Sequence, residues 1–288
     1  MMTIAVMTWI EILRKRVLIV TIALTLLFLG LFTYAVHSMA SGLATFAAGA
    51  GMGLMNNFLH GALFLAIGMY AASFTVAYLA IFSAAGTIST EIENGLLLAI
   101  LPRPLARWRV YVGKFIGYAF WGLLYGAVMY WSVVVIVKMN LPFPASVTSL
   151  LRGFAVFEGI PLILVTLSML ASLYLPTLGA GISVSLLFGV GLIGGVLQRM
   201  NFGTGPATSL DQVGLITSLM VPSNALYYRM VYELMGGSNS PVNLTQLNGQ
   251  LGPFGGGAAP SNAFLVYAAV YICVLVVFSA YHFTRKDI

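Results

Sequence analysis

Six long apolar stretches dominate the sequence and constrain what the chain can fold into. A helix needs about 20 mostly apolar residues to cross a bilayer, and windows of that kind occupy residues 17–36, 61–86, 111–137, 150–171, 177–197 and 264–283. Only 7% of the residues are charged, against about 25% in a soluble domain. Helices satisfy their own backbone hydrogen bonds in lipid. The sequence therefore predicts an all-α integral membrane protein, with six transmembrane helices in a single transmembrane domain, 1–288.

The distribution of Lys and Arg predicts the orientation of these spans. Cytoplasmic loops are enriched in Lys and Arg, and placing both termini inside puts nine of the thirteen basic residues on the cytoplasmic side: Arg14, Lys15, Arg16, Arg103, Arg107, Arg109, Lys114, Arg285 and Lys286. We therefore expect a multi-pass protein of the cytoplasmic membrane, with a cytoplasmic loop at 87–110 and an extracytoplasmic loop at 198–262. The first apolar run exceeds the 7–15 residues of a signal-peptide core, which favours a retained span.

The segments between the spans have distinct patterns. Residues 1–16 combine apolar side chains with a basic cluster, which is typical of a helix lying in the membrane interface. Residues 37–60 predict a short hairpin or frayed helix ends, and Pro176 predicts a turn between the fourth and fifth spans. Within the long outer loop, residues 215–235 are apolar enough for one or two short interfacial helices, with a break at Pro222.

Several kinds of chemistry lack their motifs. The chain has no G-x-x-x-x-G-K-[ST] loop for nucleotide phosphates, no H-E-x-x-H and no G-x-S-x-G. Its single cysteine, Cys273, excludes an internal disulfide framework and a multi-cysteine metal site. The formal net charge of +6 is explained by membrane orientation rather than by nucleic-acid binding. We therefore expect no enzymatic activity, no cofactor and no metal site in this chain, and no nucleic-acid partner.

The loop at residues 87–110 carries the most specific pattern. Thr90 and Glu93 have the spacing of a capping box, which predicts a short helix from there to Leu101. Pro102 ends that helix, and Pro104 suits the first turn of the helix that enters the third span. An apolar helix framed by charges is suited to docking in a groove of a soluble partner.

This loop resembles the cytoplasmic loop of ABC-2 type transporter permeases. The resemblance rests on a Glu-x-Glu-x-Gly pattern followed by Leu, Pro, Arg and Gly-Lys, at Glu91, Glu93, Gly95, Leu101, Pro104, Arg107, Gly113 and Lys114. The ending at residues 283–288 and the basic patch before the first span are also similar to that family. Leu96 and Leu98 depart from its usual Thr and acid. Within the family, the chain looks most like stand-alone permeases of the copper-processing and multidrug-exporter type.

The resemblance implies a function and partners. A separate ATPase subunit would dock on residues 87–110, and a second permease chain, identical or different, would complete an export pathway. Glu91, Glu93, Gly95, Leu101, Pro104 and Arg107 would then couple the chain to the ATPase. Gly113 and Lys114 would belong to the gate at the start of the third span. The two glutamates would pair either with bases of the ATPase or with Arg107 and Arg109, and the sequence does not decide between these.

One ionisable residue stands out inside the spans. A carboxylate within lipid is costly and faces a partner, water or substrate, so Glu158 is a candidate pathway residue. Three glycine pairs with four-residue spacing permit close helix approach, within the chain or between chains: Gly113 and Gly117, Gly122 and Gly126, and Gly191 and Gly195. An ion-coupled secondary transporter and a non-transporting membrane scaffold are the alternative functions. The substrate is not predicted.

Overall fold

The computed structural model describes residues 7–12, 16–50, 53–93, 107–141, 146–199, 209–235 and 260–285, and within these ranges the chain forms helices joined by short turns. Six stretches there are long and apolar enough to cross a membrane, so the predicted all-α membrane fold with six spans is confirmed. They run Leu18–Gly42, His60–Glu93, Arg107–Asn140, Val147–Tyr174, Thr177–Val196 and Asn262–Arg285.

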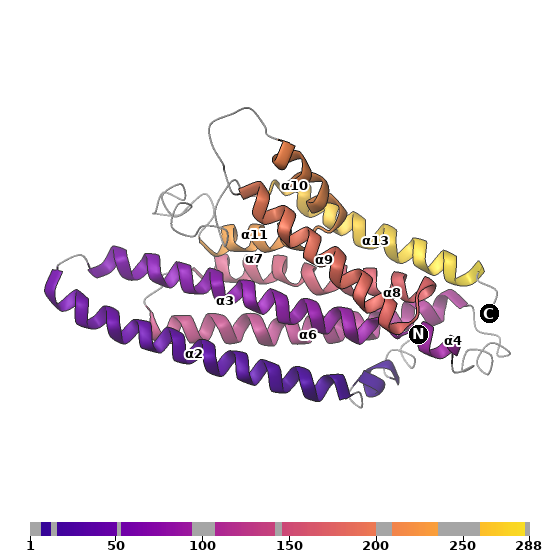
Figure 1. Ribbon diagram of the computed structural model, residues 1–288, viewed down its shortest axis with the longest axis horizontal. Coiled ribbons are helices and arrows are strands. Elements are labelled where there is room, and N and C mark those ends of the chain that lie inside the picture. The colour runs from indigo at the N-terminus through magenta and orange to yellow at the C-terminus, as the bar shows by residue number, and fades with distance from the viewer. Residues whose placement is uncertain are drawn as a thin grey trace.

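The helices form an elongated bundle with their axes roughly along its length (Figure 1). In chain order they are α2 (Arg16–Ala50), α3 (Gly53–Ala84), α4 (Ser89–Glu93), α6 (Arg107–Asn140), α7 (Val147–Phe157), α8 (Gly159–Tyr174), α9 (Thr177–Arg199), α10 (Ser209–Met220), α11 (Ser223–Leu234) and α13 (Asn262–Arg285). Because α2 continues to Ala50 and α3 begins at Gly53, most of residues 37–60, predicted as a short hairpin or frayed helix ends, is regular helix.

The spans differ in how deeply they lie in the bundle. In the spans containing α3 and α8, 61% of the residues of the most apolar window are buried, against 17% for α2 and 11% for α13. Gly68 of α3 shows how the centre packs, because a Cβ atom there would lie only 2.8 Å from Val133 of α6 and would also overlap the Phe32 ring of α2. The low burial of α2 and α13 shows that their apolar faces lie at the periphery of the bundle.

The fourth span is broken into α7 and α8 at Glu158. The Ser146 hydroxyl accepts a hydrogen bond from the Ser149 amide and caps α7. Pro161, in the first turn of α8, has no amide proton and cannot donate to the Phe157 carbonyl four residues earlier, which explains a local break. The predicted turn before the fifth span is present, since α8 ends at Tyr174 and α9 begins at Thr177.

The outer segment contains two helices, α10 and α11, with the break near Pro222 that the sequence predicts. The sequence predicts one or two interfacial helices here, and α11 is not one of them, because most of its residues are buried inside the protein. Two of its polar side chains donate hydrogen bonds inside the protein: Asn224 Nδ2 to the Gly191 carbonyl of α9, and Tyr227 Oη to the Ala66 carbonyl of α3. Ser223 Oγ and Asn224 Oδ1 are buried without a hydrogen-bond partner among the described residues. The hydrogen bonds of Asn224 Nδ2 and Tyr227 Oη lower the free-energy cost of burying these two groups.

Candidate functional site

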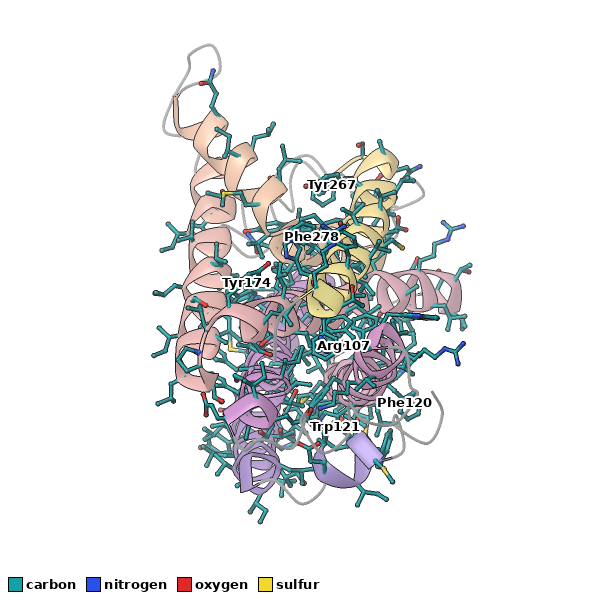
Figure 2. All side chains as sticks on the ribbon, turned by 90° about the vertical axis from the view of Figure 1, so that its right-hand side faces the viewer. Arg107, Phe120, Trp121, Tyr174, Tyr267 and Phe278 are labelled. Atoms are coloured by element: carbon teal, nitrogen blue, oxygen red, sulfur yellow. The ribbon has the colours of Figure 1, made fainter. Side chains whose placement is uncertain are left out.

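The described residues of the coupling motif gather at one end of the bundle. There the chain leaves α3, turns through residues 85–88, forms α4 and later enters α6 at Arg107. Figure 2 views the bundle from this end and labels Arg107, at the start of α6, and Tyr174, at the end of α8. Gly95, Leu101 and Pro104 lie outside the described residues, and so does the predicted helix beyond Glu93. We call the end of the bundle where α4 and the start of α6 lie the motif end.

Glu91 and Lys114 of the motif form an ion pair. The side chains of the lysine and glutamate are only 9% and 19% exposed, and the Lys114 ammonium also donates to the Thr87 carbonyl at 3.2 Å. The pair therefore fastens α4 to the first turns of α6. Of the two partners predicted for Glu91, the intrachain type is present, but the base is Lys114 rather than Arg107 or Arg109.

Glu93 has a different environment from Glu91. It ends α4 and is exposed, whereas Glu91 is partly buried. At the start of α6, the Arg109 guanidinium lies 5.6 Å from the centre of the Trp108 ring, and both side chains are exposed. The motif thus contains one glutamate that holds the chain together and one that faces outward.

A cluster of hydroxyl groups joins α4 to the turn between α8 and α9. The Thr177 hydroxyl lies 3.1 Å from the Ser89 hydroxyl and 3.0 Å from the Thr90 hydroxyl. Just before α4, the Ile88 amide donates to the Ser172 hydroxyl of α8 at 3.2 Å. A displacement of α4 must therefore disturb the ends of both α8 and α9.

The predicted capping box at Thr90 is wrong. The Thr90 amide donates to the Gly86 carbonyl and the Ile92 amide to the Ile88 carbonyl, so Thr90 lies inside α4 rather than at its start. The turn after α3 already supplies acceptors for the first amides of α4, and a side-chain cap is not needed. The Thr90 hydroxyl is used for the contact with Thr177 instead.

A short helix at residues 7–12 packs against α6 near the same end. The Trp9 ring centre lies 4.7 Å from that of Phe120 and 5.8 Å from that of Trp121, two rings labelled in Figure 2. Thr8 and Ile12 are buried, while Met7 and Ile10 are exposed. One face of this short helix is thus held by the bundle and the other is apolar and open, which suits the interfacial position expected for residues 1–16.

Glu158 lies in the break between α7 and α8, and its carboxyl group is directed at α6. A Cβ atom at Gly126 would lie 3.0 Å from Oε2 and 3.1 Å from Oε1. Each oxygen exposes less than 1 Å², and neither has a hydrogen-bond partner within the described part of the chain. One turn earlier on α6, a Cβ atom at Gly122 would lie 3.2 Å from Pro161 Cβ. The Gly122 and Gly126 pair is therefore used within one chain, to admit the start of α8.

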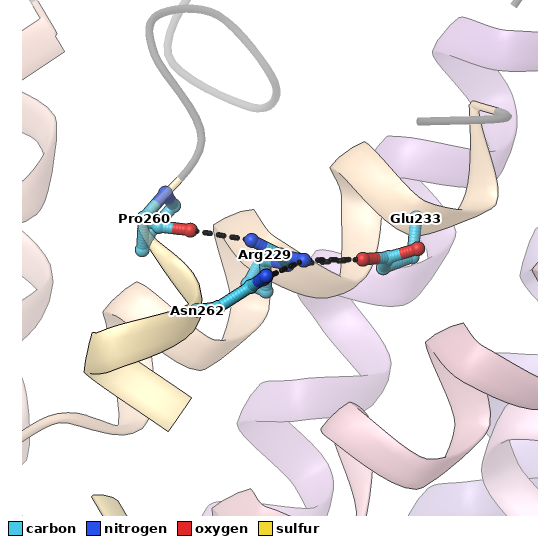
Figure 3. A network of polar contacts seen from close by, with 4 residues as sticks. All are labelled: Arg229, Glu233, Pro260 and Asn262. Carbon is cyan, nitrogen blue, oxygen red and sulfur yellow. Dashed lines mark hydrogen bonds and ion pairs between the residues drawn. The ribbon is translucent and has the colours of Figure 1, made fainter. Parts of the chain in front are cut away.

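A second polar network, not predicted from the sequence, ties α11 to the start of α13 (Figure 3). Arg229 forms an ion pair with Glu233 at 2.6 Å, and it donates to the Pro260 carbonyl and to Asn262 Oδ1, each at 2.7 Å. The i,i+4 spacing of Arg229 and Glu233 was a signal available in the sequence. The partners at 260–262 were not, because they lie 31 and 33 residues away.

The comparisons with known proteins concern the chain as a whole. A family model described as "ABC-2 family transporter protein" matches residues 2–288, almost the whole chain. A comparison with curated protein sequences gives no match. Among the described residues, no group of three or more His, Cys, Asp or Glu side chains is placed to hold a metal ion.

Proposed function

Because the chain belongs to the ABC-2 family of transporter proteins, we propose that this multi-pass membrane protein is the permease subunit of an ATP-driven exporter in the cytoplasmic membrane. A separate ATPase subunit docks on residues 87–110, and a second permease chain, identical or different, completes the pathway. In this proposal the motif end and both chain termini face the cytoplasm. The chain itself contributes no hydrolytic chemistry.

The attachment of α4 is the observation that carries this proposal. A partner can shift the state of a transporter only if it binds two states with different free energies. The ion pair to Lys114 and the hydroxyl contacts to Thr177 connect α4 with α6 and α9. A force applied to α4 by a closing ATPase dimer would therefore reach α6 and α9. It would also reach α3, which precedes α4 across the turn at residues 85–88, and α8, through the contact between Ile88 and Ser172.

Glu93 is the docking acid in this proposal. Its exposed carboxylate is available to a basic residue of the ATPase, whereas Glu91 is occupied by Lys114. The family resemblance assigns docking contacts also to Gly95, Leu101, Pro104 and Arg107. Glu91 instead keeps α4 in the position from which docking takes place.

The test is capture of the partner in mild detergent. The tagged chain is expressed in its own cells, purified with associated proteins and assayed for a Walker-motif ATPase. Glu93→Arg should reduce the recovered ATPase about tenfold or more, because reversed charge at an interface is strongly unfavourable. Arg152→Glu is the matched control, since Arg152 is an exposed residue of α7 away from the motif.

The outcome separates the proposal from its alternatives. If no ATPase accompanies the wild-type chain, an ion-coupled secondary transporter or a non-transporting scaffold replaces the exporter. If the ATPase is recovered equally with Glu93→Arg and with Arg152→Glu, docking at Glu93 is refuted. We avoid Glu91 in this experiment because its substitution also breaks the ion pair with Lys114.

A further inference from the structure

The carboxyl group of Glu158 differs from those of the two paired glutamates in the helices. Glu91 is paired with Lys114 and Glu233 with Arg229. Glu158 has no such base, and both of its oxygens lack a hydrogen-bond partner among the described residues. Burying an unsatisfied carboxyl group costs several kcal/mol, and ionisable groups within spans mark pathways and binding sites. An acid buried at this cost points to a partner beyond the described residues.

The backbone around Glu158 adds a second acceptor. Pro161 leaves the Phe157 carbonyl without its usual helical donor. Glu158 itself makes no side-chain hydrogen bond to the start of α8, so its carboxylate is not used as a helix cap. Its oxygens are directed at Gly126, where the missing side chain leaves room for them. The break thus offers oxygen acceptors, a pattern seen where discontinuous membrane helices bind cations.

Aromatic rings line the same region. Tyr130 lies one turn beyond Gly126 on α6, and its ring centre is 5.6 Å from Phe157, 5.4 Å from Phe154 and 5.5 Å from Trp131. Aromatic faces attract organic cations, most strongly where water is excluded. Small inorganic ions are strongly hydrated and gain little from apolar rings. The neighbouring rings therefore favour a large cation with apolar substituents.

Helix α11 covers this region. A Cβ atom at Gly159 would lie 2.7 Å from Leu226 Cδ1, and one at Gly153 would lie 3.0 Å from Leu234 Cγ. Both leucines are buried residues of α11. The structure therefore has this site closed between α6, α7, α8 and α11, and access requires these helices to separate.

We propose that Glu158, together with the rings of Tyr130, Phe154 and Phe157, binds a lipophilic organic cation, such as an ammonium or phosphonium group with apolar substituents. The proposal rests on the proposed transport function, for which it names the substrate class. The carboxylate neutralises the positive charge, and the rings contact the apolar substituents. Binding takes place when α6 and α8 move apart.

The test measures binding of tetraphenylphosphonium to the full chain in nanodiscs by equilibrium dialysis, with empty nanodiscs subtracted. Tetraphenylborate is the probe of similar size and opposite charge. Glu158→Gln should weaken tetraphenylphosphonium binding about tenfold or more and leave tetraphenylborate unaffected. Glu158→Asp keeps the charge and should retain binding within a few-fold. Glu11→Gln removes the same charge at an exposed position outside the spans and is the matched control.

Three results would overturn the site. One is equal tetraphenylphosphonium affinity of Glu158→Gln and wild type, with both proteins eluting as folded species in size-exclusion chromatography. Another is equal binding of the two probes by the wild type. The third is displacement of tetraphenylphosphonium by millimolar sodium, which would indicate an inorganic-cation site. Because ATPase capture is measured separately, failure here leaves the exporter proposal intact, and Glu158-dependent binding without an ATPase would refute the exporter alone.

Discussion

The ion pair between Glu91 and Lys114 makes a quantitative prediction through a double-mutant cycle. Glu91→Gln removes the carboxylate and leaves the Lys114 ammonium, in a side chain that is only 9% exposed, with the Thr87 carbonyl as acceptor. Breaking a buried pair from one side costs about 3–5 kcal/mol. We expect about 3 kcal/mol of lost unfolding free energy, the low end of that range, because Thr87 remains.

Lys114→Met and the double variant complete the cycle. The double variant should lose less unfolding free energy than the two single variants together. Lys114→Met leaves Glu91, which at 19% exposure can reach water, and should cost about 2 kcal/mol. The double variant replaces the whole pair by neutral side chains, and such replacement of a buried pair is far less damaging than breaking it. We expect the double variant to lose about 2 kcal/mol, which gives a coupling energy of about 3 kcal/mol.

Thermal unfolding followed by tryptophan fluorescence measures the cycle in one detergent and lipid mixture. At about 2–4 °C per kcal/mol, Glu91→Gln should lower the midpoint by about 6–12 °C, and adding Lys114→Met should restore part of the loss. If the double variant melts below both single variants, by the combined amount of their losses, then the two side chains act independently. The ion pair would then not fasten α4 to α6, and the coupling argument would lose its main support.

Three further predictions concern the packing of the spans and of α11. Gly126→Ala should destabilise the protein by about 1–3 kcal/mol, because the new Cβ would lie 3.0 Å from the Glu158 carboxyl. Gly30→Ala, with nothing within 4 Å, should instead stabilise α2 by up to about 1 kcal/mol. Thermal unfolding of both variants in parallel tests this, and equal shifts of the two midpoints would contradict it. Arg229→Lys should raise amide hydrogen exchange in α11, because an ammonium does not reproduce the planar fork that reaches three acceptors; unchanged exchange would show that the network is dispensable. Tyr227→Phe, which deletes the bond to the Ala66 carbonyl, should cost about 0.6–1.5 kcal/mol, and a larger loss in unfolding measurements would mean that the ring itself has moved.

The spans were predictable because hydropathy and length report directly on the need to satisfy backbone groups in lipid. The position of α11 was not. Its sequence predicts a short helix, but the depth at which that helix lies depends on Gly191 and Ala66, whose carbonyls accept from Asn224 and Tyr227. Such partners lie 33 and 161 residues away, and a single sequence carries no signal of that pairing.

The sequence could predict which residues belong to the candidate site, but not which of them contact each other. The motif identified Glu91 and Lys114 as important residues, yet it did not show that they contact each other across the intervening 23-residue separation. Sequence spacing suggested Arg107 and Arg109 as bases, since they are closer along the chain. Lys114 is favoured in three dimensions because it lies on the buried face of α6, where the turn after α3 supplies the Thr87 carbonyl as a further acceptor.

The network around Arg229 has a consequence for the order in which the protein completes its fold during synthesis. Helix α11 can settle between α3, α7, α8 and α9 as soon as these earlier helices have entered the membrane. The carbonyl of Pro260 and the side chain of Asn262 reach Arg229 only after the ribosome has made the start of the last span. Until then, among the described residues, the guanidinium has only the Glu233 carboxylate and the neighbouring Tyr232 ring, so a nascent chain halted before residue 260 would hold α11 less firmly than the finished protein.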